Sequence, residues 1–417
     1  MKLLLKNGYV IDEANGFEGE ADILVEDGKI SKCAPNLQAD ADNGIKVIDC
    51  SGKHIIPGIC DMHVHFRDPG QTHKEDIITG SEAAAAGGVT AVACMPNTSP
   101  VIDNAETVKY VIEKAKSAKI KVYPIGCITK GQMGEELCDY IELKNAGCVA
   151  VSDDGKPVRS ARMMARAMVQ AHYAGLRVIS HCEDPDIIAG GIINSGAVSK
   201  ELGVKGMHRM SEDTQTARDV VMAGDLEMPI HIAHVSTFSS MMIVRLAARC
   251  GVMVTSETAP HYFTMTDEKL RTRDADYRMN PPLRTQQDVT AITEGVCDGT
   301  IDCIVTDHAP HSPEEKADFE KAPNGVVGLE TSLAATLTQL YHTGKISLKR
   351  IVRLMCVNPR KILGIPGGSF TEGAPADITV FDINEEWTVD PDKLHGKSKN
   401  TCFKGMTLKG RVKLTIV

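Results

Sequence analysis

The sequence predicts an α/β protein: a (β/α)8 TIM-like barrel with a small β-sandwich domain formed from both chain ends. Two observations lead to this fold class. Eight strand-like apolar runs alternate with helical stretches through the middle of the 417-residue chain, which is typical of βα units around a parallel sheet. The two ends carry instead short β-type runs separated by turn dipeptides, which is typical of antiparallel strands.

The small β domain is predicted from residues 1–54 and 366–417, and the barrel from residues 55–365. The N-terminal part contains "KLLLKNGYVI", "ADILVEDGKISKC" and "IKVIDCSGKHIIPG", with Asn-Gly, Asp-Gly and Ser-Gly turns. The C-terminal part returns to the same pattern in "ADITVFDINEEWTV" and "GRVKLTIV". Similar patterns at both ends predict that the two ends pair in one domain.

The barrel strands are predicted from eight apolar runs. In chain order they are "GICDMHVH", "VTAVACMPN", "IKVYPIGCI", "CVAVSDDG", "LRVISHCED", "IHIAHVS", "VMVTSETAPH" and "DCIVTDHAPH". Helical stretches lie between them, for example residues 74–88 and 160–175. Gly87, Gly147 and Gly175 are placed where these helices should end. Eight such units favour a closed barrel over an open sheet.

Composition narrows the class of protein. Apolar residues make up 42% and charged residues 24% of the chain, and the net charge is -9 without a basic block. This excludes a basic nucleic-acid-binding face and an affinity for anionic membranes. Thirteen scattered cysteines, with no CxxC pair, indicate reduced thiols in a cytoplasmic protein. We identify no signal peptide and no run near the ~18 apolar residues of a membrane span.

Polar, titratable residues end most of the apolar runs, where a barrel places its catalytic groups. His63 and His65 are two residues apart, so both can point into the barrel mouth from one strand. Arg67 lies on the same face if the strand continues to it. Asp61, two residues before His63, also lies on this face and is expected to support the two histidines from behind. The alternative is a pair of packed or surface histidines.

A metal site is the sharper interpretation, because His181, His234 and Asp307 end three further runs. Imidazole nitrogens and carboxylate oxygens suit Zn²⁺, Mn²⁺ or Fe²⁺, with zinc the default. "VSDDG" adds Asp153 and Asp154, either of which could lie between two metals, unless the segment only forms a turn. Asp307 could instead cap a helix, but Ser312 before Pro313 is the better cap. His261 ranks below the other histidines as a ligand.

Hydrogen-bonding residues near these strand ends predict an anionic substrate with amide edges. They are Arg67, Asn97, Asn280 and His311. The guanidinium of Arg67 offers a bidentate fork to a carboxylate, while Asn280 in "MNPPLR" could also cap a turn.

Taken together, the motifs resemble those of the amidohydrolase superfamily, and most closely the class I bacterial dihydroorotases. They are "PGICDMHVHFRDPG", "MPNTSPV", "VSDDG", "SHCED", "HVST", "MNPPLR", "TDHAPH" and "NGVVGLE", in the family's order over nearly the whole chain. Many relatives place a carboxylated lysine where this chain has "SDDG", whereas class I dihydroorotases use an aspartate; Lys156 lies beyond the turn.

The resemblance implies a reaction and a role for each residue. The reaction is reversible hydrolysis of dihydroorotate to N-carbamoyl-L-aspartate in pyrimidine synthesis, with Asp307 moving the proton. Two zinc ions per subunit are implied. The implied metal ligands are His63, His65, Asp154, His181, His234 and Asp307, with Asp154 bridging and Asp153 as the fallback. The implied substrate contacts are His65, Arg67, Asn97, Asn280, His311, Asn324 and Gly325. Segment 311–325 is a plausible loop over the mouth.

Two alternatives remain at this point. An allantoinase or hydantoinase shares the fold and the cyclic amide chemistry, but the missing lysine at the strand end disfavours it. A catalytically silent scaffold for aspartate transcarbamoylase would lack metal ligands, and all the expected ligands are present. The family implies a homodimer, and aspartate transcarbamoylase as a possible partner.

Overall fold

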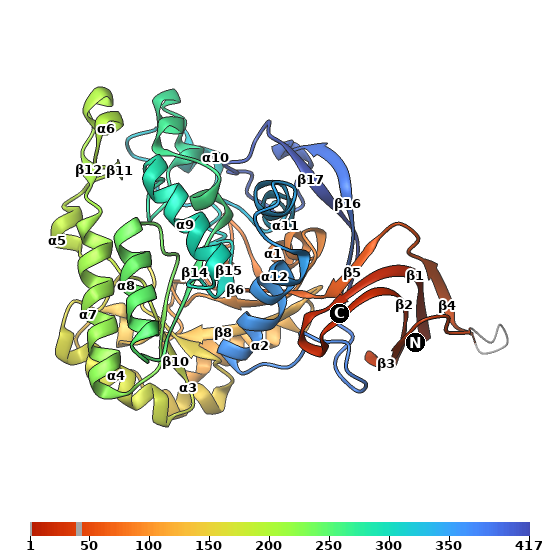
Figure 1. The fold of residues 1–417 in the computed structure, drawn as a ribbon. Coiled ribbons are helices and arrows are strands. Elements are labelled where there is room, and N and C mark those ends of the chain that lie inside the picture. The colour runs from red at the N-terminus through yellow and green to blue at the C-terminus, as the bar shows by residue number, and fades with distance from the viewer. Residues whose placement is uncertain (1, 39–43) are drawn as a thin grey trace.

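The computed structural model describes residues 2–38 and 44–417, and its larger part is the predicted barrel (Figure 1). All eight predicted apolar runs contain a strand of one parallel sheet, whose order is β15-β14-β13-β10-β9-β8-β7-β6. The strands are β6 (Ile59–Val64), β7 (Val89–Cys94), β8 (Lys121–Gly126), β9 (Ala150–Val151), β10 (Arg177–Ser180), β13 (Ile230–Ile232), β14 (Val254–Thr258) and β15 (Cys303–Ile304).

The first and last strands of this sheet meet, so the barrel is nearly closed. A parallel bridge joins Val64 to His308, and the backbone amide of His65 donates to the carbonyl of His308 at 2.8 Å. The carboxylate of Asp61 accepts from the amide of Thr306 at 3.1 Å. These contacts bring the ends of β6 and β15 to the same mouth.

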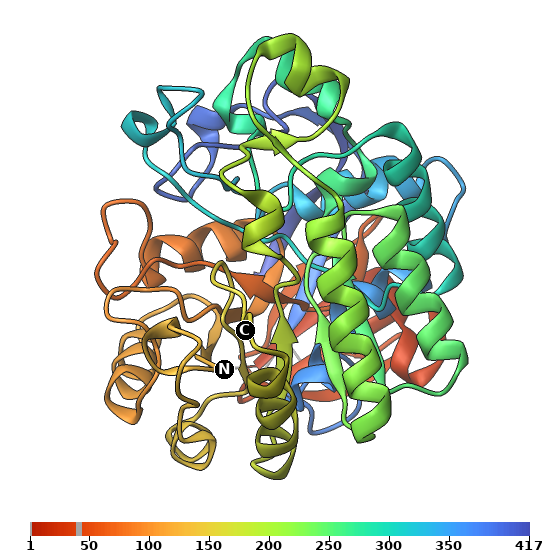
Figure 2. The ribbon, with the colours of Figure 1, turned by 90° about the vertical axis from the view of Figure 1, so that its left-hand side faces the viewer.

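Helices surround the barrel in the alternation that the sequence predicts. They are α1 (Ile77–Ala86), α2 (Ala105–Ala115), α3 (Tyr140–Ala146), α4 (Ala161–Tyr173), α7 (Met210–Leu226), α8 (Phe238–Arg249), α9 (Gln286–Asp298) and α11 (Ser332–Thr336). Gly87 and Gly147 end α1 and α3, and Gly175 follows α4. Helices α7 and α8 run side by side on the outside (Figure 2). After α11 come α12 (Leu348–Val352) and α13 (Asn358–Leu363).

A small extension is inserted between β10 and α7. It contains α5 (Pro185–Ile188), β11 (Ile193–Asn194), α6 (Ala197–Leu202) and β12 (Gly206–Met207), and Figure 1 shows it projecting from one end of the barrel. Its buried side chains Ile193 and Val198 pack with Leu270 and Phe319 in a separate cluster. The extension therefore lies against the segments that follow β14 and β15.

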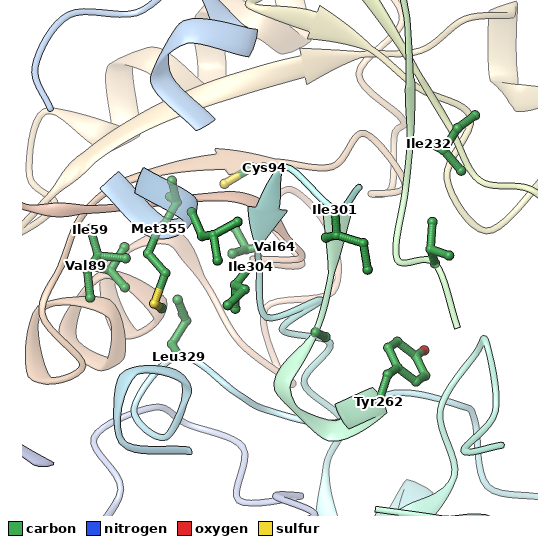
Figure 3. Packing of buried hydrophobic residues seen from close by; sticks show 14 of the residues in the cluster. Ile59, Val64, Val89, Cys94, Ile232, Tyr262, Ile301, Ile304, Leu329 and Met355 are labelled. Atoms are coloured by element: carbon green, nitrogen blue, oxygen red, sulfur yellow. The ribbon is translucent and has the colours of Figure 1, made fainter. Parts of the chain in front are cut away.

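Apolar packing occurs on both sides of the barrel wall. The largest cluster lies between strands and helices and includes Ile59, Val89, Ile304 and Leu329 (Figure 3). A second cluster gathers residues from strands all around the sheet, such as Met62, Ala91, Ile125 and Cys303, so it fills the barrel interior. A filled interior beneath the strand ends gives the mouth a rigid floor.

Both chain ends form the small β domain, as predicted. Its strands are β1 (Lys2–Asp12), β2 (Phe17–Glu26), β3 (Lys29–Ala34), β4 (Lys46–Asp49), β5 (His54–Pro57), β16 (Ile378–Thr388) and β17 (Thr407–Ile416). They belong to one continuous mixed sheet, ordered β17-β16-β5-β1-β2-β3 with β4 beside β1, where a two-sheet sandwich was expected. The predicted boundaries at 54 and 366 stay predictions; β5 ends in this sheet at Pro57.

Two further sequence expectations concern cysteines and membranes. None of the thirteen cysteines forms a disulfide. Among the residues that the structure describes, no helix combines the length and apolar character of a membrane span.

Candidate metal centre

Six buried side chains converge at the barrel mouth from five different strand ends. Each comes from the polar end of a run that is apolar up to that point, so the strand alternation delivers them to one place. They are His63 on β6 and His65 just after it, Asp154 after β9, His181 after β10, His234 after β13 and Asp307 after β15. All six ligands expected from the sequence are thus brought together.

Two overlapping groups of these residues have the composition of a metal site. His63, His65 and Asp307 form the first, with His65 Nε2 at 3.1 Å and His63 Nε2 at 3.5 Å from Asp307 Oδ1. His63, Asp154 and His234 form the second. His181 joins the second group, since its Nδ1 lies 2.7 Å from His234 Nε2 and 3.2 Å from Asp154 Oδ1.

Asp154 faces both groups, whereas its neighbour Asp153 faces neither. Oδ1 of Asp154 lies 3.5 Å from the Nε2 atoms of both His63 and His234, and Oδ2 lies 3.4 Å from His65 Nε2. Asp153 accepts from the amides of Ile128 and Thr129 instead. The geometry favours Asp154 as the acid between two cations.

The electrostatics of the cluster favour positive charge between the rings. Burial acts to raise the pKa of Asp154, but His63 and His181 outweigh it and hold that pKa well below the ordinary value. For His181 burial acts to lower the pKa, and Asp154 and Glu183 overcome it and raise the pKa to about 10. Without a cation the cluster therefore holds protons, which a bound metal would displace.

Oxygen atoms lie behind three of the four histidines. His65 Nδ1 contacts Asn97 Oδ1 at 2.8 Å, and His63 Nδ1 contacts Glu257 Oε1 at 2.5 Å. His181 Nε2 lies 3.6 Å from Glu183 Oε2. Such partners orient metal-bound imidazoles in many proteins. Glu257 and Glu183 are not among the residues predicted from the sequence, although both belong to predicted strand runs that carry polar residues near their ends.

Unpartnered polar atoms provide a test of whether these residues fit metal ions. Within the described residues, His63 Nε2, His181 Nε2 and Asp154 Oδ1 are buried and have no hydrogen-bond partner. Buried polar groups are almost always paired. Two of these atoms, His63 Nε2 and Asp154 Oδ1, face one another at 3.5 Å, and this indicates that a cation partner belongs between them. The donor set of imidazole nitrogens and carboxylates suits zinc. The residues present therefore fit a pair of metal ions.

Arg67 and His311 lie together beside this centre. Nε of Arg67 donates to the carbonyl of Pro310 at 3.2 Å, and Nη2 lies 3.3 Å from His311 Nε2. Burial and the adjacent Arg67 lower the pKa of His311 to about 3, so its ring is neutral at neutral pH. The pair leaves guanidinium N–H groups that could bind an anion.

Arg67 was expected on the same strand face as His63 and His65 only if the strand continued that far, and it does not. β6 ends at Val64, and Arg67 has a φ of 57°. His234 and Asp307 also have positive φ, at 32° and 48°. Left-handed backbone at bulky residues is strained and is found preferentially at functional sites.

Segment 311–325 carries Asn324 and Gly325 to the same side of the mouth. His311 Nε2 lies 3.0 Å from the carbonyl oxygen of Asn324, and the amide of Gly325 donates to the carbonyl of Arg278 at 2.9 Å. Ser312 caps α10 (Pro313–Lys316), as predicted. These two backbone groups already contact His311 and Arg278, so a role of Asn324 and Gly325 in substrate binding stays a prediction.

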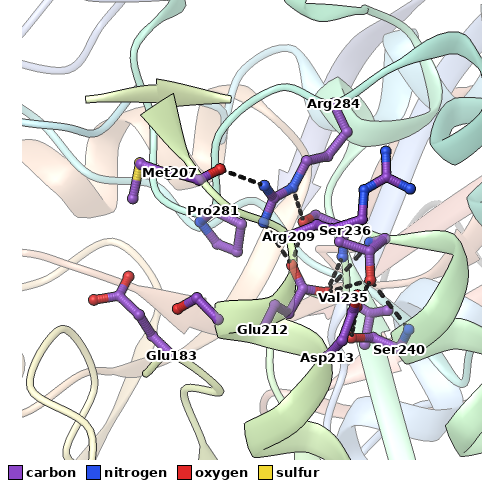
Figure 4. Close-up of polar contacts among 12 residues, drawn as sticks. Glu183, Met207, Arg209, Glu212, Asp213, Val235, Ser236, Ser240, Pro281 and Arg284 are labelled. Carbon is purple, nitrogen blue, oxygen red and sulfur yellow. Dashed lines mark hydrogen bonds and ion pairs between the residues drawn. The ribbon is translucent and has the colours of Figure 1, made fainter. Parts of the chain in front are cut away.

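Asn280 is brought to the site by a buried polar network. Its amide donates to Glu183 at 2.5 Å, close to His181. In the same "MNPPLR" motif, Arg284 forms a buried ion pair with Glu212 and donates to the hydroxyl of Ser236 (Figure 4). Glu212 accepts from the amide of Ser236, two residues after His234. The network links the Asn280 loop to the His234 loop.

Two residues of uncertain role are now placed. Asp61 accepts from the backbone amides of His63 and Thr306 and so supports the mouth from below. Burial raises its pKa to about 7. His261 is buried after β14, and burial lowers its pKa to about 4. It belongs to neither group with metal-site composition.

Comparisons with known proteins agree with this geometry. Residues 52–240 match a family model described as Dihydro-orotase-like. A dihydroorotase of Geobacter sp. (strain M21) is 52% identical and covers 100% of this chain and 98% of its own. A dihydroorotase of Acetivibrio thermocellus is 49% identical, with coverage of 100% and 97%.

Solved structures with the same fold include hydantoinases. An L-hydantoinase (dihydropyrimidinase) from Arthrobacter aurescens superposes with a TM-score of 0.87 at 26% identity, covering 100% of this chain and 94% of its own. A dihydropyrimidinase from Brevibacillus agri NCHU1002 gives a TM-score of 0.86 at 24% identity, with coverage of 99% and 93%. The second likeness shows the fold alone.

Proposed function

The chain belongs to the dihydroorotase family, and we propose that the six side chains of its metal centre hold two zinc ions for the opening of the dihydroorotate ring. The reaction is the reversible hydrolysis of the cyclic amide of dihydroorotate to N-carbamoyl-L-aspartate. The observation that carries the proposal for the site is the convergence of four histidines and two aspartates from five strand ends. Cations at such a site lower the pKa of bound water and polarise a carbonyl oxygen.

His63, His65 and Asp307 would hold one ion, and His181 and His234 the other, with Asp154 between them. Two observations support this division. His65 contacts Asp307 in the first group and His181 contacts His234 in the second, and one Asp154 oxygen lies near His63 and the other near His65. Asn97 behind His65 and Glu183 behind His181 would fix the orientations of these two rings.

Asp307 would be the proton carrier. Burial acts to raise its pKa, but His63 and His65 outweigh burial and lower it below the ordinary value. The side chain is therefore an ionised base at neutral pH. In the hydrolytic direction water adds to the ring carbonyl carbon and the carbon–nitrogen bond breaks. Asp307 takes the proton from that water and delivers it to the leaving nitrogen.

Arg67, Asn97 and His311 would bind the carboxylate that the ring carries. The guanidinium is buried beside the centre and retains free donors, and a bidentate contact fixes both position and angle. Asn280, together with His65 and the backbone at Asn324 and Gly325, would contact the amide edge. Holding the ring in one orientation places its carbonyl against the attacking water.

Hydantoin or allantoin hydrolysis is the second candidate function, favoured by the hydantoinase-like fold. Asp154 stands where the lysine of those relatives was expected, which disfavours it. A homodimer, and an association with aspartate transcarbamoylase, are further proposals that light scattering of the purified chain alone and with that partner would test.

The decisive experiment measures zinc content and ring opening on purified protein. We expect about two zinc ions per chain, activity on dihydroorotate, and little activity on hydantoin or allantoin. Asp307→Asn should lower kcat by roughly 10²–10⁴-fold, the usual contribution of a positioned proton carrier, while circular dichroism shows an unchanged fold. A near-normal rate in this variant would refute the role of Asp307.

A further inference from the structure

A second pair of titratable residues lies behind His63, inside the barrel. The Glu257 carboxylate contacts His63 Nδ1 at 2.5 Å through Oε1 and His231 Nε2 at 3.1 Å through Oε2. Nδ1 of His231 in turn lies 2.8 Å from the hydroxyl of Thr255. His63, Glu257 and His231 are each 0% exposed. Three strands, β6, β13 and β14, supply this chain of contacts, which the proposed reaction does not use.

The carboxylate of Glu257 sets where the protons lie on the two histidine nitrogens that face it. An ionised carboxylate only accepts, so His63 donates through Nδ1–H and His231 donates through Nε2–H. The Thr255 hydroxyl beside His231 Nδ1 donates to the carbonyl of Ile230 at 3.4 Å. In the neutral ring this places the lone pair of His63 on Nε2, which faces Asp154 and Asp307 in the metal centre. That atom has no hydrogen-bond partner among the described residues, and Asp154 Oδ1 and Asp307 Oδ1 each lie 3.5 Å from it.

Two histidines, and no lysine or arginine of the described part of the chain, face the Glu257 carboxylate. Over residues 2–38 and 44–417, its hydrogen-bond and ion-pair partners are the two histidines alone. A fully buried ionised carboxylate is costly unless it is paired. A cation bound at Nε2 of His63 would add positive charge on the far side of the ring that Glu257 contacts. An ordinary buried ion pair would not require His63 to direct Nδ1 at Glu257 and Nε2 at the metal centre.

We propose that Glu257 is a positioning residue of the metal centre, which holds His63 in its Nδ1–H form and strengthens it as a ligand, while His231 holds Glu257. The inference rests on the proposed metal centre. It predicts that metal affinity depends on a carboxylate that contacts neither metal nor substrate. Partners of this kind typically contribute 10–100-fold to metal affinity.

The test is Glu257→Gln, which keeps the size of the side chain and removes its charge. We expect zinc affinity, measured by competition with a chelator, to fall roughly 10–100-fold. The absorption spectrum of the cobalt-substituted protein should shift. Ring opening should recover with excess zinc, and KM for dihydroorotate should change little, because Arg67 and His311 are untouched. Ser256→Ala is the matched control: Ser256 is also buried on β14, but its hydroxyl donates to the carbonyl of Thr300.

The outcomes separate the two proposals. If wild-type protein binds no zinc, the proposed metal centre fails. If wild-type protein binds zinc and Glu257→Gln binds it as tightly as Ser256→Ala does, with an unchanged cobalt spectrum, only the role of Glu257 is overturned. If Glu257→Gln does not fold, nitrogen NMR of zinc-loaded, histidine-labelled wild-type protein decides. His63 must then carry its proton on Nδ1, and an unprotonated Nδ1 overturns the proposal.

Discussion

Asp153 and Asp154 are neighbours in the sequence, yet their carboxylates lie in different environments. Asp153 bonds the backbone amides at the end of β8, and burial raises its pKa to about 6. Burial acts to raise the pKa of Asp154, but His63, His181 and His234 outweigh it and hold that pKa well below the ordinary value. Single-residue changes can therefore separate a loop anchor from a metal ligand.

We expect Asp154→Asn to lose most of its bound metal and nearly all activity, because the bridging charge is gone. Asp153→Asn should keep its metal and lose stability, by about 1–3 kcal/mol for the weakened buried hydrogen bonds. Metal analysis and thermal melting of both variants test this pair of expectations. Loss of metal from Asp153→Asn alone would reverse the assignment.

Arg67 provides a second test at the residue scale. Arg67→Ala should retain zinc while KM for dihydroorotate rises by roughly 10–100-fold, since hydrogen bonds to charged groups contribute ~1.5–3 kcal/mol. Arg67→Lys keeps the charge but loses the planar fork, so its KM should be intermediate. An unchanged kcat/KM in Arg67→Ala would remove this residue from the substrate site.

Among the structural elements, segment 311–325 depends on one buried lysine. Nζ of Lys316 donates to the carbonyls of Arg278, Pro323 and Gly325 at 3.2, 3.0 and 3.0 Å. These bonds hold the beginning and end of the loop together, next to His311. Burial lowers the pKa of Lys316 to about 8, so the ammonium loses its proton at a lower pH than an exposed lysine does.

This arrangement predicts an alkaline weakening of substrate binding. Below pH 8 the ammonium can donate three hydrogen bonds, and above it the neutral amine can donate only two, so KM should rise with pH through this range. Lys316→Met should have a severalfold higher KM at pH 7, normal zinc content, and no such pH dependence.

The control for this prediction is Lys321→Met, in the same loop. The Lys321 side chain is 85% exposed, and its removal should leave KM unchanged at every pH. If wild type and Lys316→Met had the same KM at every pH, the hydrogen bonds of Lys316 would not position the loop.

For the whole molecule, the metal centre joins strand ends that are far apart in the chain. The proposed ligands span residues 63 to 307, while the apolar interior holds the strands from below. Removing the ions should leave buried imidazoles and carboxylates facing one another. The proposed ions are therefore expected to stabilise the folded barrel as well as to take part in catalysis.

Treatment with a chelator should abolish activity and lower the apparent melting temperature. At free zinc a hundredfold above its Kd, binding to the folded state adds ~2.7 kcal/mol. Zinc affinity should weaken as pH falls, because protons compete for His181, whose metal-free pKa is raised to about 10. Calorimetry with and without zinc at several pH values measures both effects. An unchanged melting temperature would contradict a stabilising role for the ions.

The sequence by itself determined the eight barrel strands, the pairing of the two ends in one domain, and the six polar strand-end side chains that meet at the barrel mouth. It could do so because strand and helix periodicity are local, and parallel strands bring their ends to one edge whatever the loops do. The separation of Asp153 from Asp154, the place of Arg67 and the contacts of Glu257 were decided only by the tertiary structure. A register shift within β6 and left-handed backbone at Arg67 break the simple alternation. Glu257, 194 residues from His63, acquires its role only where two strands meet, because long-range hydrogen bonds leave no periodic mark on the chain.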